Sequence, residues 1–180
     1  MKYFIILALM VAAPFISYAQ NDTLVSYSAI IEAPGVSQSD LFTRGRQWFN
    51  EFFRNSKYVI QIADKETGEI AGKGAMRITA YYLEYSKLGN VFISNFSINI
   101  YVKNGRYKYV LKEFSITYDD GTVLFSPLTS SETTNVKAFL TSNKRMQSAY
   151  TAIREANDKK VKELIESLTN AMQNANPNDF

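Results

Sequence analysis

The stretch FSINIYVKNGRYKYVLKEFSI, residues 96–116, consists of two runs of alternating apolar and polar residues on either side of Asn104-Gly105. Asn-Gly favours a two-residue turn between antiparallel strands, because both of these residues adopt positive φ easily. Strict alternation places the apolar side chains of each run on one face of a strand. The stretch therefore predicts a long β-hairpin whose apolar face carries Phe92, Phe96, Ile98, Ile100, Tyr107, Tyr109 and Leu111.

The alternation changes phase near the end of this hairpin. Leu111 is at an odd position, whereas Phe114, Ile116 and Tyr118 are at even positions. One extra residue in the strand, a β-bulge, would return both sets to the same face. We expect the bulge near Lys112-Glu113.

The strand expected before the hairpin contains the sequence ETGEIAGKGAMR, residues 66–77, and its GKG suggests a phosphate-binding loop. Such a loop needs G-x-x-x-x-G-K-[ST] followed by a helix, because backbone N–H groups at the helix N-terminus hold the phosphates. Here Gly68 precedes Gly72 by one residue too few, Gly74 replaces the hydroxyl residue, and the pattern that follows is a strand. We therefore exclude a nucleotide site.

The two glycines of this strand share a face with Ile70, Met76 and Ile78, which predicts that they lie on the core side. The stretch SQSDLFTRGRQWFNEFFRNS, residues 37–56, predicts an amphipathic helix, with Ser37 and Asp40 as a variant capping box. Its apolar side carries Leu41, Gly45, Trp48, Phe49, Phe52 and Phe53. Glycine in a strand marks a close approach of another group, so we expect Gly72 and Gly74 to make room for these rings.

Four further segments complete the pattern. Residues 24–32 and 58–63 alternate as strands, the latter with Tyr58, Ile60 and Ile62 on one side, and Asp119-Asp120-Gly121 leads into a short strand, residues 122–125. From about residue 136 to 172 the pattern is helical, with a buried stripe of Met146, Tyr150, Ile153, Val161, Leu164, Ile165, Leu168 and Met172. The order predicts the α+β class, with a single antiparallel sheet of five or six strands and two long helices packed on one face.

The first twenty residues predict export. Lys2 precedes an apolar run, and Ser17-Tyr18-Ala19 is a small-x-small cleavage site before Gln20, as in a secretory signal peptide. The run is shorter than the roughly 20 residues of a membrane span, although an uncleaved anchor is the alternative. We expect a signal peptide at 1–19, a single domain at 20–174, a disordered tail at 175–180, no transmembrane span after cleavage, and a periplasmic or extracellular location.

Composition limits the chemistry. The chain has no His and no Cys, which removes His-dependent and Cys-dependent nucleophilic sites and nearly all zinc sites. A carboxylate pair and a Ser–Lys dyad remain open, but the acids are at turns and solvated strand positions, so we expect no enzymatic activity and no cofactor. The net charge of +3 is too small to indicate nucleic acid as a partner.

The polar face of the expected sheet is the candidate binding surface. Its side chains come from three strands that should be adjacent, include four bases and no acid, and point away from the helices. Such a face suits an anion or a protein partner, although a solvated sheet face is the alternative. The candidate residues are Lys73, Arg77, Asn95, Asn99, Tyr101, Lys108 and Lys112.

A cluster of tyrosines, Tyr81, Tyr82 and Tyr85, lies between two expected strands. It could stack on a sugar or peptide, or be partly buried at the edge of the sheet.

The chain resembles the domain of unknown function 4468 family, exported bacterial proteins described as having a TATA-binding-protein-like (TBP-like) fold. The likeness extends over about residues 24–170 and rests on RGRQWFNEFF, GEIAGKGAMRI, the hairpin and the closing helix. The resemblance implies a curved sheet backed by helices; it implies no activity, and it does not imply DNA binding. We expect a non-enzymatic envelope module that binds a protein or an anionic polymer. A carboxylate-dependent hydrolase and a carrier of a small anionic ligand are the alternatives.

Overall fold

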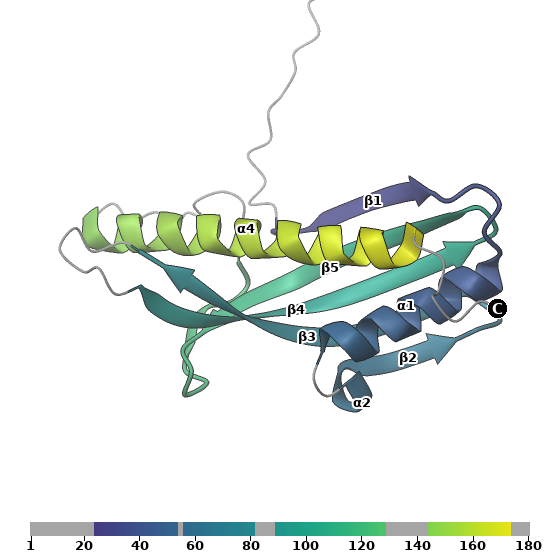
Figure 1. Cartoon of the computed structure of the whole chain (residues 1–180). Coiled ribbons are helices and arrows are strands. Elements are labelled where there is room, and N and C mark those ends of the chain that lie inside the picture. The colour runs from purple at the N-terminus through teal and green to yellow at the C-terminus, as the bar shows by residue number, and fades with distance from the viewer. Residues whose placement is uncertain (1–23, 54–55, 82–88, 129–143, 174–180) are drawn as a thin grey trace, which may run out of the picture.

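The computed structural model describes residues 24–53, 56–81, 89–128 and 144–173. It contains one six-stranded antiparallel sheet with helices on one side (Figure 1). The elements in chain order are β1 (Tyr27–Glu32), α1 (Gln38–Phe52), α2 (Ser56–Val59), β2 (Ile60–Asp64), β3 (Glu69–Ala80), β4 (Asn90–Lys103), β5 (Arg106–Thr117), β6 (Val123–Phe125) and α4 (Lys144–Gln173). The strand order is β1-β5-β4-β3-β2, and β6 pairs with β5. The predicted α+β class and the arrangement of two long helices on one face are confirmed.

The β4–β5 hairpin is the centre of the sheet. Its strands pair from Lys103↔Arg106, beside the turn, to Ile93↔Thr117 at the far end. The predicted bulge is present: Asn95 pairs with Ser115 but Ser97 pairs with Lys112, so two residues of β5 lie opposite one residue of β4. Glu113 has φ of 60°, the left-handed conformation found in one class of bulge. The extra residue turns Phe114 back to the side of the sheet on which Leu111 lies.

Helices α1 and α4 pack on the same side of the sheet, which we call the covered face; the opposite side is the open face (Figure 1). Helix α1 begins at the N-cap Ser37, whose hydroxyl accepts a hydrogen bond from the backbone N–H of Asp40 at 3.1 Å. Its rings Trp48 and Phe49 are buried in the core together with Ile98 and Ile100 of β4. The aromatic underside predicted for this helix is confirmed.

The glycines of β3 allow close packing on the covered face. A Cβ on Gly74 would lie 2.7 Å from Cζ of Phe96 and 2.9 Å from Cε1 of Phe53, and a Cβ on Gly72 would lie 2.4 Å from the carbonyl oxygen of Val59. All three distances are below van der Waals contact, so neither position accommodates a side chain without movement. Gly74 therefore makes room for the ring of Phe53, as predicted, whereas Gly72 makes room for the backbone of Val59 and not for a ring.

Helix α4 begins at Lys144 within the described residues; the predicted start near residue 136 lies outside them. Its buried stripe follows the prediction, with one polar exception. Asn157 is fully buried, and its side-chain oxygen accepts a hydrogen bond from the hydroxyl of Ser94 on β4 at 2.6 Å. The next residue, Asp158, accepts a hydrogen bond from the hydroxyl of Tyr27. Polar contacts thus join α4 to two separate strands.

One predicted strand differs from the structure. Residues 56–59 form the short helix α2, and the strand begins only at Ile60. A register shift between Ile60 and Ile62 then pairs Ile60 with Gly72 and Ile62 with Ala71. Consequently Ile62 lies on the open face and is 47% exposed, and Tyr58 is 87% exposed. The prediction that Tyr58, Ile60 and Ile62 share a side was wrong, because Tyr58 lies in α2 and the bulge between Ile60 and Ile62 reverses the alternation.

Candidate functional site

The open face is best described as rows of side chains that run across the paired strands. One row joins Glu69, Tyr101, Lys108 and Ile30 through successive pairs, and the next joins Ile62, Ala71, Asn99, Val110 and Ser28. Beyond these, Lys73, Ser97 and Lys112 form a third row. Three further pairs, beyond the bulge, are Ala75 with Asn95, Asn95 with Ser115, and Arg77 with Ile93.

The structure brings all seven predicted residues onto this face. Lys73 and Arg77 come from β3, Lys108 and Lys112 from β5, and the remaining three from β4, which lies between these strands. The four basic residues and Tyr101 are exposed, and the two asparagines are half-buried. The geometric part of the prediction is therefore correct for every one of these residues: Lys73, Arg77, Asn95, Asn99, Tyr101, Lys108 and Lys112.

The prediction of a face without acids was wrong. Arg77 donates to Asp119 at 2.7 Å, Lys112 lies 3.5 Å from Glu113, and Asn99 donates to Glu69 at 3.4 Å. Three separate causes bring these acids to the face. Glu69 lies four residues before Lys73 on β3 and therefore points to the same face. Glu113 is the bulge residue, and Asp119 belongs to the turn after β5. The face is mixed in charge rather than uniformly basic.

Glu113 is stabilised as a carboxylate. The hydroxyl of Ser97 donates to it at 2.5 Å. This hydrogen bond, with smaller contributions from Lys112 and Lys73, holds the pKa of Glu113 below its ordinary value. A carboxyl group with a lowered pKa is an acceptor or a charge partner at neutral pH and a poor general acid.

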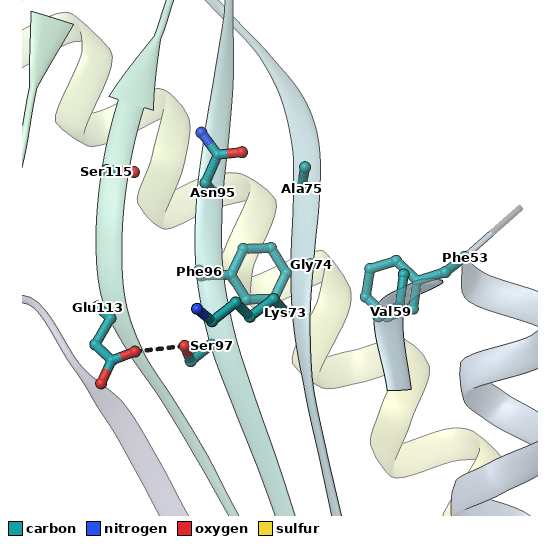
Figure 2. Close-up of a pocket in the computed structure, with 10 residues that line it drawn as sticks. All are labelled: Phe53, Val59, Lys73, Gly74, Ala75, Asn95, Phe96, Ser97, Glu113 and Ser115. Atoms are coloured by element: carbon teal, nitrogen blue, oxygen red, sulfur yellow. Dashed lines mark hydrogen bonds between the residues drawn. The ribbon is translucent and has the colours of Figure 1, made fainter. Parts of the chain in front are cut away.

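A groove of about 670 Å³ lies beside the centre of the open face. Its lining combines residues of both faces of β3 with residues of α2 and of the end of α1. Figure 2 shows Phe53 and Val59 on the side of β3 away from β4, and Glu113 and Ser115 on the opposite side, on β5. The groove therefore curves around the edge of β3. Its lining residues are Phe53, Val59, Lys73, Gly74, Ala75, Asn95, Phe96, Ser97, Glu113 and Ser115.

Sequence reasoning included Tyr101 but missed the aliphatic residues Ile30 and Ile62 of the open face. Ile30 is 62% exposed and Tyr101 is 39% exposed, on either side of Lys108 in the same row. Ile62 lies in the neighbouring row. The alternation of residues 24–32 could have indicated that Ile30 points to the other face of its strand from Ala29 and Ile31. Which strand pairs with it, however, depends on the tertiary structure.

The tyrosine cluster can be placed only in part. Tyr81 is 66% exposed, so the prediction of partial burial does not hold for this residue. Tyr82 and Tyr85 lie outside the described residues, as do the predicted signal peptide and the C-terminal tail.

The described part of the chain contains no helix that is long and apolar enough to cross a membrane. Among the same residues, no three or more acidic side chains are grouped as a metal site would require.

Comparisons with known proteins place the fold. A search of curated proteins finds no match. A crystal structure of a DUF4468 family protein from Bacteroides ovatus aligns with a TM-score of 0.60 and 16% identity, over 88% of this chain and 91% of that one. A TBP-like protein from Parabacteroides distasonis aligns with a TM-score of 0.56 and 15% identity, over 85% and 95% of the two chains.

The family model described as a domain of unknown function with TBP-like fold matches residues 27–117. This range begins at the first residue of β1 and ends at the last residue of β5, so it contains α1 and the five strands of the main path of the sheet. From this match, the chain belongs to the DUF4468 family.

Proposed function

We propose that this protein is a non-enzymatic, exported module of the bacterial envelope that binds a partner protein through the open face of its sheet. The observation that carries the proposal is the composition of that face. It is uncovered by the described helices, and its exposed residues include Ile30, Ile62 and Tyr101 within two neighbouring rows. Apolar and tyrosine side chains surrounded by charges are typical of protein interfaces.

The charge pattern favours a protein over an anionic polymer as the partner. A polymer of repeated negative charge binds best to a field of one sign. Here Arg77 and Lys112 each lie beside an acid, and Glu69 is in the same row as Lys108. Alternating charges of this kind fit a partner surface that also carries both signs.

A carboxylate-dependent hydrolase is supported less well. Such an enzyme needs two carboxyl groups about 5–10 Å apart across a cleft, one of them with a raised pKa. The described lining of the groove includes a single acid, Glu113, and its pKa is lowered. A carrier of a small anionic ligand would also need more than one base directed into the groove, and its described lining contains Lys73 alone.

Photo-cross-linking in the native cells tests the proposal. A photoreactive amino acid replaces Ile30 or Ile62 on the open face, and Glu155 or Lys162 on the exposed side of α4 serves as the matched control. We expect discrete protein adducts from the two open-face positions and none of the same mass from the helix positions. Identical adducts from both sets, or none from the open face, would contradict the proposal.

Export has a separate test. Cleavage after Ala19 gives a mature chain that begins at Gln20, and the intact mass of protein from the envelope fraction measures this directly. A species that retains residues 1–19 would show that the predicted signal is not processed.

A further inference from the structure

Strand β3 is longer than its neighbour β2. The pairs between them run from Asp64↔Glu69 to Ile60↔Gly72, whereas β3 continues to Ala80 and pairs with β4 along its whole length. In the described part of the chain, no strand pairs with residues 73–80 on the β2 side. This segment is an open edge on the β2 side of β3.

The pairing pattern shows which backbone groups this edge presents. The N–H of Val102 on β4 donates to the carbonyl of Gly68 at 2.8 Å, so even-numbered residues of β4 direct their backbone groups toward β3. In an antiparallel pair the direction alternates from one residue to the next. Their partners Gly74, Met76 and Ile78 therefore face β4. The N–H and C=O groups of Lys73, Ala75, Arg77 and Thr79 point outward, as a template for another strand.

The groove lies along the first part of this edge. Its lining includes Lys73, Gly74 and Ala75 of β3, with Val59 and Phe53 beyond them (Figure 2). Ala75 is exposed and its side chain is small, so β3 presents no bulky side chain to an added strand at this position. An added strand would place alternate side chains toward Phe53 and Val59 and the others beside the open-face residues.

The charges on the edge indicate the chemistry of the occupant. Lys73 and Arg77 are the open-face bases of this segment, and Lys73 forms no ion pair with any described residue. A second copy of the chain that paired symmetrically about Ala75 would place Lys73 opposite Arg77, and one that paired about Arg77 would place two arginines together. Pairing about Met76 would place Lys73 opposite Thr79 and give Lys73 no carboxylate partner. Like charges directly opposite are destabilising. A strand from a different protein with a carboxylate beside Lys73 avoids this repulsion.

We propose that residues 73–79 of β3 bind an extended segment of a partner protein by strand addition. The segment alternates apolar residues, directed toward Phe53 and Val59, with polar residues that include an acid beside Lys73. This inference rests on the proposed function and specifies its mode: backbone hydrogen bonds of the edge supply affinity, and the two lined sides of the groove select the sequence.

Substitution at Ala75 tests the backbone directly. Ala75→Pro removes one outward N–H and leaves the β3–β4 pairing unbroken, because proline is tolerated on a strand edge. Ala75→Val keeps the N–H and is the matched control. With the photoreactive residue at Ile62, we expect the cellular adduct to fall at least about tenfold further in Ala75→Pro than in Ala75→Val, because only proline removes the N–H. An undiminished adduct in Ala75→Pro would overturn strand addition and leave the proposed function standing; no adduct in the unsubstituted protein would overturn the proposed function itself.

A peptide selection tests the edge independently of the native partner. Random nine-residue peptides displayed on phage are selected on the mature protein and then bound to both variants. We expect enriched peptides to alternate apolar and polar residues, to include an acid, and to bind Ala75→Val at least about tenfold more tightly than Ala75→Pro. No enrichment, or equal binding to both variants, would show that residues 73–79 do not bind an added strand.

If Ala75→Pro does not fold, amide hydrogen exchange of the unsubstituted protein decides the matter. On binding of a selected peptide, the amides of Ala75, Arg77 and Thr79 should exchange at least about tenfold more slowly, since an amide in a strand pair is protected from water. Unchanged exchange at these three amides would overturn the inference.

Discussion

Ile98 and Asn99 are neighbours in β4, yet Ile98 is fully buried beneath the helices and Asn99 is half-buried on the open face. The same alternation continues in β3, where Gly74 has no room for a Cβ and Ala75 is exposed. Side chains on the covered face are constrained by contact with rings and backbone, whereas those on the open face have mixed charge and partial exposure. The comparison indicates that the tightest packing constraints lie on the covered face of each strand.

The largest expected effect is at the centre of the covered face. Ile98→Ala should lower the free energy of unfolding by about 2–5 kcal/mol, because it removes a fully buried side chain from a packed core. Asn99→Ala, one residue away, should cost less than about 1 kcal/mol, since it loses only a 3.4 Å hydrogen bond to Glu69. Urea unfolding of both variants measures the contrast. Equal losses would break the distinction between the faces.

The next effect tests the close approach at Gly74. Gly74→Val should destabilise the protein by about 1–3 kcal/mol through overpacking against Phe96 and Phe53. Ala75→Val is the matched control on the open face, and we expect a change within about 0.5 kcal/mol. Thermal melting in the presence and absence of ATP completes the test, and stabilisation of the unsubstituted protein by ATP would restore the phosphate-loop interpretation that we excluded.

A smaller effect concerns the bulge. Both Glu113→Gly and Glu113→Ala remove the carboxylate that accepts from Ser97, but only glycine adopts a φ of 60° without strain. Glu113→Gly should therefore be more stable than Glu113→Ala by about 1 kcal/mol. Comparison of the two denaturation midpoints isolates the backbone from the side chain. If alanine is as stable as glycine, the bulge carries no conformational strain.

The smallest effect on stability is expected for the bases of the open face. Lys73, Arg77, Lys108 and Lys112, changed together to Gln, should leave the melting temperature nearly unchanged, because exposed substitutions rarely exceed about 0.5 kcal/mol each. Recovery of the cross-linked partner should fall, and the remaining binding should depend less on salt. Undiminished recovery of every partner would show that these bases belong only to a solvated surface.

Much of this fold could be predicted because its signals are local. The Asn104-Gly105 turn, the phase slip before Phe114 and the glycines facing the aromatic helix each depend on a few consecutive residues. The same alternation also placed all seven candidate residues on one face. The bulge of β2 could not be predicted, since the residues around Gln61 contain no glycine and no visible change of phase.

The sequence by itself determined which face each side chain of the central hairpin occupies, where helix α1 begins, and which chemistries the chain lacks. Strand alternation, capping and composition depend only on neighbours in the chain. Only the tertiary structure decided that β1 pairs with β5, that Asp119 reaches Arg77, and that β2 begins opposite Gly72 and leaves residues 73–80 of β3 as an open edge. These features join residues far apart in the sequence, and their choice depends on how the whole sheet packs beneath the helices rather than on any local pattern.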